Sequence, residues 1–250
     1  MNRRAPLQRI DTSAGGADAL GDAASLSRKK LALICSQKCP GDVILKTYDF
    51  ARLVRGSGLV IVSGFHSPIE KDCLPILLRG PGPIIIVQAH RLSTSRLPKE
   101  WQKAIEAKRL LLLSPFVVSA RRTVDQRSTL QSAVAAVSDR RRRSEIDATD
   151  RRSEIDVAGR RSETAATVPN TAKRVTAELA AERNRFVAAI SDEVLIPFAA
   201  SGSKTEALAL SLLASGKPVY TFSDRPSPLL SAGARLIPAD FFSASPATPK

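Results

Sequence analysis

The sequence predicts an α/β fold in which a doubly wound, mostly parallel sheet is covered by helices on both faces. Apolar runs of strand length recur along the chain and alternate with stretches of helix length. The apolar runs are continuous rather than alternating, which is typical of strands buried on both faces of a sheet. A strand, a crossover helix and a further strand, repeated, is the pattern of a parallel sheet.

The predicted elements follow one another in the order that this fold requires. Strands are predicted at 31–35, 59–62, 84–87, 110–113, 194–198 and 219–222. Helices are predicted at 42–55, 68–79, 98–108, 176–191 and 204–215. Near and within 176–191, the spacing of Val175, Leu179, Phe186 and Ile190 predicts a buried stripe.

Composition divides the chain into five segments. Residues 1–27, rich in Ala, Gly, Asp and Ser without a sustained period, are predicted to form a flexible arm. Residues 28–119 and 172–240 are predicted to be the two parts of the α/β domain. Between them, 120–171 is predicted to be a low-complexity insertion without fixed structure. Residues 241–250, rich in Ser, Pro, Ala and Thr, are predicted to be a disordered tail.

The predicted insertion contains an internal repeat of nine residues. RRSEID occurs at 142–147 and 151–156, and RRSE at 160–163. A period of nine places successive isoleucines on opposite faces of a helix, so no continuous apolar seam is expected. Residues 140–163 hold eight arginines against six acidic residues, a net of +2. We interpret the segment as a surface expansion, with a basic arm for nucleic acid as the alternative.

The overall charge points to a polyanionic partner. The chain has 38 basic and 24 acidic side chains, a net charge of +14, and a pI near 10.3. Such a balance favours nucleic acid as the first partner to consider. No apolar run approaches the roughly 20 residues that span a bilayer, and the N-terminus lacks the apolar part of a secretory signal. We therefore expect a cytoplasmic protein without membrane contact.

Few residues are suited to metal binding or nucleophilic catalysis. Three cysteines and two histidines leave little for a metal cage, and the odd cysteine number favours reduced thiols. Cys35 and Cys39 have the wrong spacing for a zinc or redox pair. His66 and His90 both follow predicted strands, but no nucleophile stands in a G-x-S-x-G turn. We therefore expect no metal, no cofactor and no catalytic residue.

The turn after the second predicted strand has features of a ligand loop. Ser63 and Gly64 follow the strand directly, and Gly64 allows a close approach of the backbone. Ser67 is the expected cap and Pro68 the first residue of the next helix. Such a turn presents N–H groups at the edge of the sheet where α/β folds bind ligands. The alternative is a well-formed turn with no further role.

A second candidate loop precedes the helix predicted at 204–215. Ser203 and Glu206 have the spacing of a capping box, which is the structural interpretation. The loop also combines hydroxyl groups, a glycine and a cation at one helix N-terminus, where the helix dipole favours anions. Its candidate phosphate-binding residues are Ser201, Gly202, Ser203, Lys204 and Thr205. It is not a Walker loop, since Ser203 separates the glycine from Lys204.

A third candidate is the tripeptide Arg183-Asn184-Arg185 in the helix before the strand predicted at 194–198. Two arginines flanking an asparagine can pair with phosphate oxygens. The alternative is a solvated helix face.

Together these segments resemble the DNA-processing protein A (Smf) family, DNA recombination mediators built on an extended Rossmann-like domain. The matching segments are 31–36, 60–64, 110–115, 183–196, 201–207 and 216–220. The stretch from Arg183-Asn184-Arg185 to Lys217-Pro218-Val219-Tyr220 is the most specific. One departure is Pro68-Ile69-Glu70, where family members continue the Ser-Gly turn with a second glycine followed by Ile-Asp.

The resemblance implies single-stranded DNA binding in a basic pocket at the carboxyl edge of the sheet. Phosphate contacts would come from Ser63, Gly64, Arg183, Arg185 and residues 201–205, while Asn184 would order the turn. It also implies a bacterial, non-enzymatic protein that passes the strand to a RecA-type recombinase during DNA-mediated transformation, and it leaves a homodimer open. We expect a minimal, single-domain member.

An alternative function comes from the related lysine-decarboxylase-like superfamily, which includes nucleotide sensors and nucleoside-monophosphate hydrolases. Those hydrolases carry a glycine-rich loop with a catalytic glutamate, whereas 200–206 has one glycine and a glutamate suited to capping. The alternative is therefore a sensor of a nucleotide or of another small phosphorylated ligand.

Overall fold

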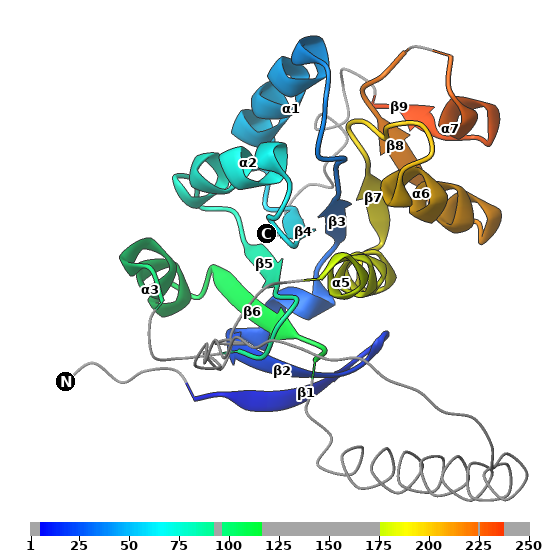
Figure 1. The fold of residues 1–250 in the computed structure, drawn as a ribbon. Coiled ribbons are helices and arrows are strands. Elements are labelled where there is room, and N and C mark those ends of the chain that lie inside the picture. The colour runs from blue at the N-terminus through cyan, green and yellow to red at the C-terminus, as the bar shows by residue number, and fades with distance from the viewer. Residues whose placement is uncertain (1–5, 93–96, 117–175, 225, 238–250) are drawn as a thin grey trace, which may run out of the picture. The chain divides into compact units, whose positions relative to one another are not determined.

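One mixed β-sheet forms the centre of the computed structural model, which describes residues 6–92, 97–116, 176–224 and 226–237. Within these residues the sheet has nine strands in the order β1-β2-β6-β5-β4-β3-β7-β8-β9 (Figure 1). All pairings from β6 to β9 are parallel, and β2 pairs antiparallel with both β1 and β6. The predicted α/β fold with a mostly parallel sheet is confirmed.

The elements have the following bounds. The strands are β1 Gln8–Thr12, β2 Gly15–Gly21, β3 Lys30–Leu33, β4 Val60–Ser63, β5 Ile84–Val87, β6 Leu110–Ser114, β7 Glu193–Leu195, β8 Val219–Thr221 and β9 Arg235–Leu236. The helices are α1 Gly41–Val54, α2 Pro68–Leu78, α3 Lys99–Glu106, α5 Ala177–Ile190, α6 Lys204–Ala214 and α7 Pro228–Ser231, with a 3₁₀ helix, η1, at Ala23–Ser27. Each strand and helix predicted from the sequence is present, with bounds shifted by a few residues.

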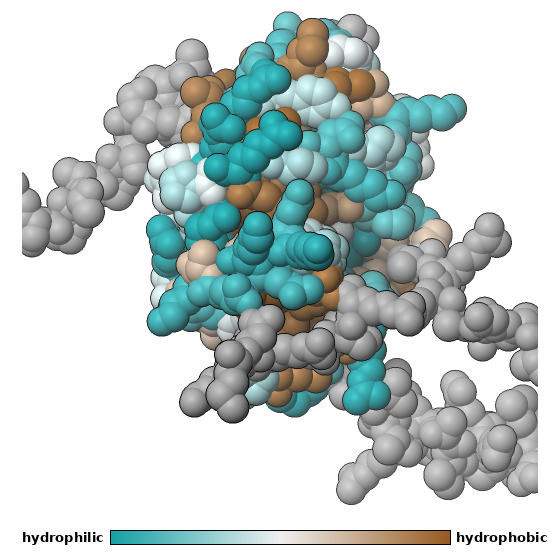
Figure 2. Space-filling model, turned by 90° about the vertical axis from the view of Figure 1, so that its left-hand side faces the viewer, coloured by the Kyte–Doolittle hydropathy of each residue, from teal (hydrophilic) through white to brown (hydrophobic). Residues whose placement is uncertain are grey.

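Side chains of each central strand alternate between two hydrophobic layers. In β3, Leu31 and Leu33 pack with residues of α1, α2 and α3, whereas Ala32 packs with residues of α5, α6 and α7. Within the described residues, α1, α2 and α3 thus cover one face of the sheet, and α5, α6 and α7 cover the other (Figure 1). On the side formed by α1–α3, hydrophilic side chains cover most of the surface, with smaller hydrophobic areas between them (Figure 2). Burial on both faces explains why these strands are continuously apolar.

The chain changes direction across the sheet at β3. From β3 it continues through β4, β5 and β6 toward one edge, and then returns to β7 on the other side of β3. The loops that leave the carboxyl ends of β3 and β7 therefore lead to helices on opposite faces. In open α/β sheets the crevice at such a point is where ligands bind.

The prediction of a flexible arm at 1–27 is wrong for residues 6–27. These residues form the β1–β2 hairpin and η1, and β2 pairs with β6 at the edge of the parallel sheet. Ala17 and Ala19 are fully buried against the layer that contains α5. Alanine and glycine are only weakly hydrophobic, so the sequence of β2 does not show which of its residues are buried. The pairing with β6 determines its structure.

The predicted insertion at 120–171 and tail at 241–250 lie outside the described residues. Among the helices that the structure does describe, none is both long and apolar enough to cross a membrane.

Candidate functional site

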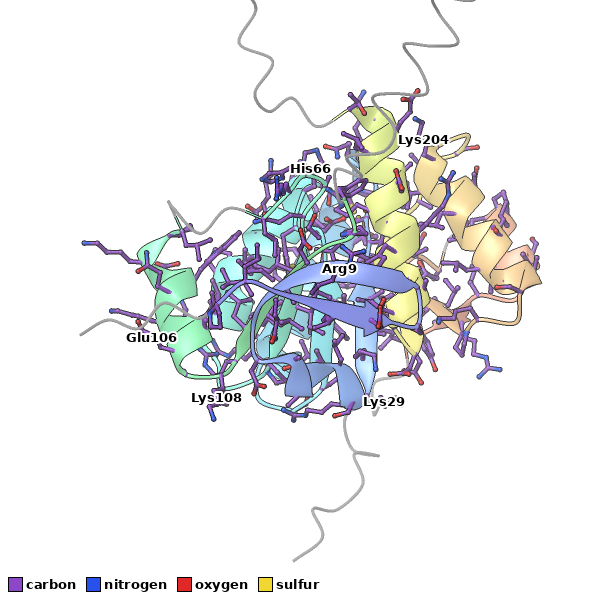
Figure 3. All side chains as sticks on the ribbon, turned by 90° about the horizontal axis from the view of Figure 1, so that it is seen from below. Arg9, Lys29, His66, Glu106, Lys108 and Lys204 are labelled. Atoms are coloured by element: carbon purple, nitrogen blue, oxygen red, sulfur yellow. The ribbon has the colours of Figure 1, made fainter. Side chains whose placement is uncertain are left out.

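A pocket of about 1060 Å³, here called the edge pocket, lies at the carboxyl ends of the central strands. Its lining comes from four places: the loop after β3 (Cys35, Ser36, Gln37, Lys38), the start of α2 (His66, Ser67, Glu70), α5 and its cap (Thr176, Ala177, Glu178, Ala180, Ala181, Glu182, Arg183, Asn184, Arg185), and α6 with its preceding loop (Ala200, Ser203, Lys204, Thr205, Ala207, Leu208, Ser211). His66 and Lys204 lie at the end of the molecule opposite Lys29 and Lys108, which precede β3 and β6 (Figure 3). The pocket therefore occupies the crevice expected of the fold.

The sequence-predicted site residues divide into two groups. Six of them line the edge pocket: Arg183, Asn184, Arg185, Ser203, Lys204 and Thr205. The other four do not belong to its lining: Ser63, Gly64, Ser201 and Gly202.

Ser63 is the last residue of β4, and Gly64 begins the loop that follows it. Ser63 is fully buried, and its Oγ donates to Glu70 Oε2 (3.4 Å) and accepts from the N–H of Phe65 (3.0 Å). A Cβ on Gly64 would lie 2.2 Å from Nε of Arg183, so only glycine leaves room for that side chain. Both residues therefore act on the pocket through their neighbours.

Glu70 joins two loops and is a site residue that the sequence analysis did not single out. Its carboxylate, 2% exposed, accepts from the N–H groups of Cys35 (2.8 Å) and His66 (2.9 Å) and from Ser67 N–H (3.4 Å). Ser67 Oγ accepts from Glu70 N–H in return, which confirms Ser67 as the cap of α2 and completes a capping box. The Ser-x-x-Glu spacing of residues 67–70 was the available signal.

Arg183 lies on the buried face of α5 and not on its solvated side. With Phe186, Val187 and Ile190 it forms the stripe that faces the sheet, and it is only 4% exposed. Its Nε and Nη2 donate to Oδ1 of Asn184 at 3.2 and 2.9 Å. Burial lowers the pKa of the guanidinium, and the nearby Glu70 carboxylate opposes that shift.

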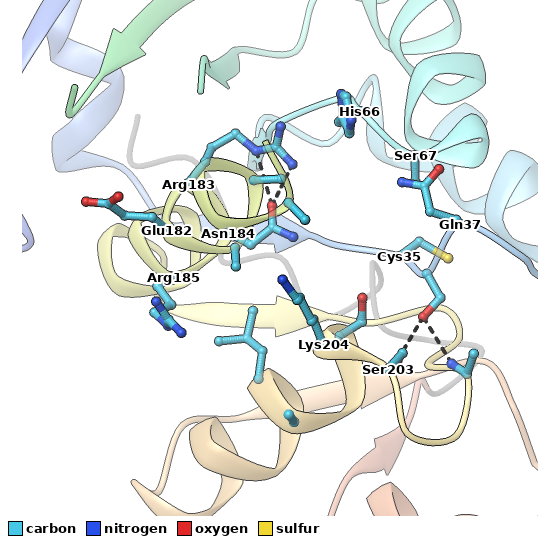
Figure 4. Close-up of a pocket in the computed structure, with 18 of the residues that line it drawn as sticks. Cys35, Gln37, His66, Ser67, Glu182, Arg183, Asn184, Arg185, Ser203 and Lys204 are labelled. Atoms are coloured by element: carbon cyan, nitrogen blue, oxygen red, sulfur yellow. Dashed lines mark hydrogen bonds between the residues drawn. The ribbon is translucent and has the colours of Figure 1, made fainter. Parts of the chain in front are cut away.

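Arg185 and Lys204 are exposed cations at the edge pocket. Figure 4 shows the side chains of Asn184 and Lys204 pointing toward one another, while Glu182 points away from them. Glu178 and Glu182 are both exposed on α5. The carboxylate of Glu70, which also lines the pocket, is already engaged by backbone N–H groups.

The loop before α6 has part of the predicted capping box. Ser203 Oγ accepts from Glu206 N–H (3.1 Å), as predicted. The Glu206 carboxylate, however, accepts from the N–H of Gly202 (2.7 Å), while the N–H of Ser203 donates to the carbonyl of Ala200 (3.1 Å). The backbone donors of residues 202 and 203 are thus engaged within the loop. The first-turn N–H groups of Lys204 and Thr205 have no carbonyl of their own helix to bond.

Ser36 connects this loop to the one after β3. Its Oγ lies 3.3 Å from Ser203 Oγ and accepts from Ala200 N–H (3.0 Å) (Figure 4). Together with the Cys35–Glu70 bond, this contact holds the loops after β3, β4 and β7 in one arrangement.

The thiols and histidines offer no metal cluster within the described residues. Cys35 and Cys73 are buried and Cys39 is half-buried, all of them free. Burial raises the pKa of the Cys73 thiol to about 12, which leaves it protonated. His66 lines the edge pocket, whereas His90 is not part of its lining.

No protein-family model and no curated protein sequence matches the chain. A solved structure of DNA processing protein A from Helicobacter pylori, which binds single-stranded DNA, is 17% identical; the match covers 96% of this chain and 94% of that one, with a TM-score of 0.60. DNA processing protein A from Streptococcus pneumoniae is 14% identical; the match covers 100% of this chain and 76% of that one, with a TM-score of 0.60. The chain therefore has the Rossmann-like α/β fold of DNA processing protein A, as the resemblance in sequence predicts.

Proposed function

We propose that the protein binds single-stranded DNA in the edge pocket and catalyses no reaction. One observation carries the proposal: the exposed cations Arg185 and Lys204 share a pocket with the amide of Asn184 and the free end of α6. The fold supports it, since a protein with the same fold from Helicobacter pylori binds single-stranded DNA.

The phosphate contacts are proposed for fewer residues than the sequence resemblance implies. Lys204 and Arg185 supply charge, and the first-turn N–H groups of Lys204 and Thr205 supply donors near the positive end of the α6 dipole. Ser63 and the N–H of Gly202 are engaged within their loops, so they support the site without meeting the strand.

A sensor of nucleotides or other small phosphorylated ligands remains the second candidate. It is favoured by the position of the pocket, because nucleotides bind at the same crevice in Rossmann-like folds. Both candidates use the same anion-binding end of α6, and they differ in whether a polymer is required.

The resemblance in sequence also supports a proposal for the role of the protein in the cell. The bound strand would pass to a RecA-type recombinase in the bacterial cytoplasm during DNA-mediated transformation, and the protein would act as a homodimer. Co-sedimentation of the protein with a recombinase on a single strand, and sedimentation velocity of the protein alone, test these two points.

The test measures the binding of single-stranded DNA, double-stranded DNA and mononucleotides by fluorescence anisotropy. It compares the wild type with two double variants. Lys204→Ala/Arg185→Ala removes two charges from the edge pocket, and Lys103→Ala/Arg235→Ala removes two exposed charges elsewhere. We expect the first variant to lose about tenfold or more in affinity for single strands, since each charge-assisted hydrogen bond contributes about 1.5–3 kcal/mol. The second should bind like the wild type.

Salt dependence separates the alternatives. For single strands the slope of log K against log salt is about −0.7 per phosphate contact, so the pocket variant should have a slope shallower by about 1.4. A wild-type isotherm unchanged between low and high salt would contradict DNA binding. Tight mononucleotide binding without strand binding would support the sensor, and release of free base from nucleoside monophosphates would contradict the absence of catalysis.

A further inference from the structure

We propose that Arg183 is a positioning residue, which fixes the amide of Asn184 so that its two N–H groups form an uncharged donor for the bound strand. The proposal rests on strand binding in the edge pocket. It gives Arg183 a different role from the phosphate contact that the sequence resemblance implies, and it gives Asn184 a contact in addition to ordering its turn.

The orientation of the Asn184 amide follows from the donors that face it. Nε and Nη2 of Arg183 approach Oδ1 at 3.2 and 2.9 Å, and both are donors that cannot accept. Turning the amide by 180° would bring its NH₂ group against these N–H groups, so only one orientation is satisfied. Nδ2 is therefore directed away from Arg183, on the side where Lys204 approaches (Figure 4).

Packing keeps the guanidinium in this place. Arg183 is 4% exposed and lies one turn before Phe186 and Val187 on the face of α5 that meets the sheet. Its Nε, Cζ and Cδ would lie within 2.8 Å of a Cβ at position 64, so the side chain rests directly on the backbone of Gly64. A buried guanidinium held on both sides has few alternative positions.

Charge also favours this arrangement. The carboxylate of Glu70, 2% exposed, is the neighbouring opposite charge that stabilises the guanidinium. A buried cation in this place would be costly without both Glu70 and the Asn184 oxygen. Burial of the Arg183 charge costs free energy, and its result is an Asn184 amide that is held in one direction at the edge pocket.

The chemistry of the amide defines what it recognises. Its N–H groups bind oxygen acceptors of the strand, which are phosphate oxygens or base carbonyls, and they release no counterions. Lys204 supplies the attraction that depends on salt. Loss of the amide should therefore weaken binding equally at all salt concentrations.

The test is a double-mutant cycle of Arg183→Lys and Asn184→Ala, measured by anisotropy on oligo-dT at several salt concentrations. We expect Asn184→Ala to weaken binding about fivefold with an unchanged salt slope, which is the size of a neutral hydrogen bond. Arg183→Lys retains the charge but not the fork, and should weaken wild-type binding by a similar factor. In the Asn184→Ala background it should have no further effect.

Three outcomes overturn the proposal. In the first, Arg183→Lys weakens binding in the Asn184→Ala background as much as it does in the wild type, and makes the slope of log K against log salt shallower. That result would make Arg183 itself a phosphate contact. Asn184→Ala could bind like the wild type. The side-chain amide signals of Asn184 in NMR spectra of the free protein could stay unchanged on Arg183→Lys, which tests the positioning even if no strand binds.

Two further arms complete the design. Gly64→Ala should displace Arg183 and reproduce the Arg183→Lys phenotype. Gly56→Ala, whose Cβ would meet nothing within 4 Å, is the matched control.

An abasic strand distinguishes the two possible acceptors of the Asn184 amide. An equal loss of affinity on the abasic strand and on oligo-dT assigns the contact to phosphate, and a loss confined to oligo-dT assigns it to a base. If wild type binds no strand at all, the proposed function fails, and the NMR result decides the positioning independently.

Discussion

His66 is a titratable side chain at the edge pocket whose surroundings disfavour its charged form. Burial, then the positive charges of Arg183 and Lys71, lower its pKa below the usual 6.5, and Glu70 partly opposes them. The unfolded chain therefore binds more protons than the folded protein between this lowered pKa and about 6.5. Stability must rise with pH through that window.

We predict that the free energy of unfolding falls as the pH is lowered below about 6.5, and that His66→Gln removes this dependence. Urea unfolding at several pH values from 5 to 8 measures it. The control is His90→Gln, since the chain has only these two histidines. Loss of the pH dependence in the control instead, or its persistence in His66→Gln, would contradict the assignment.

Arg183 and Arg185 show how residues of one type acquire different roles. They are two positions apart and thus about 200° apart around the helix, so they face different surroundings. Arg183 is buried against Gly64, whereas Arg185 is exposed at the pocket. The sequence identified both as candidates but not which of them meets solvent, because the buried stripe was traced through its apolar members.

Among the secondary-structure elements, α2 organises the edge pocket through its first turn. Glu70, three residues into the helix from its cap Ser67, also binds the backbone of Cys35 after β3 and of His66 after β4. Helix α2 thus fixes the course of two loops as well as its own start. Cys35 and Glu70 are 35 positions apart, so the helix cap joins the loops that follow two neighbouring strands, β3 and β4.

We predict that Glu70→Gln destabilises the protein by about 2–3 kcal/mol, because one amide oxygen cannot replace the two carboxylate oxygens and buried N–H groups lose their acceptor. The midpoint of urea unfolding measures the change. Glu100→Gln, in the first turn of α3 and exposed, is the matched control and should shift the midpoint little. Equal shifts in the two variants would show that Glu70 is no more than a helix-capping residue.

The starts of α2 and α6 share the pattern Ser-x-x-Glu yet differ in their hydrogen bonds. At α2 the serine and glutamate cap each other, whereas at α6 the Glu206 carboxylate reaches the N–H of Gly202. The positive φ of Gly202, 69°, turns the loop so that this N–H faces the helix. A local pattern predicts a capped helix, but the preceding loop decides which donor the glutamate meets.

At the scale of the whole molecule, the charge of +14 is distributed unevenly, and the edge pocket holds a small part of it. Residues 140–163 hold eight arginines, but six acidic residues accompany them, for a net of +2. Composition therefore indicates the kind of partner without locating its site.

We predict that replacing 120–171 by a short Gly/Ser linker retains most of the affinity for single-stranded DNA, because the acidic residues of this segment neutralise most of its charge. The Lys204→Ala/Arg185→Ala variant should lose that affinity in the same anisotropy experiment. The reverse pattern, with binding lost on deletion and kept in the double variant, would place the DNA-binding function in the insertion.

Local sequence patterns are sufficient to predict the mostly parallel sheet, its covering helices and the serine caps of α2 and α6, because each of these depends on residues close together in the chain. The β1–β2 hairpin, in contrast, depends on long-range contacts, because the small residues of β2 are held as a strand by their pairing with β6. Tertiary structure also decided the burial of Arg183 and the joining of Ser36 to Ser203, which are 167 positions apart. These features depend on contacts between segments that are far apart in the chain, so no local periodicity in the sequence predicts them.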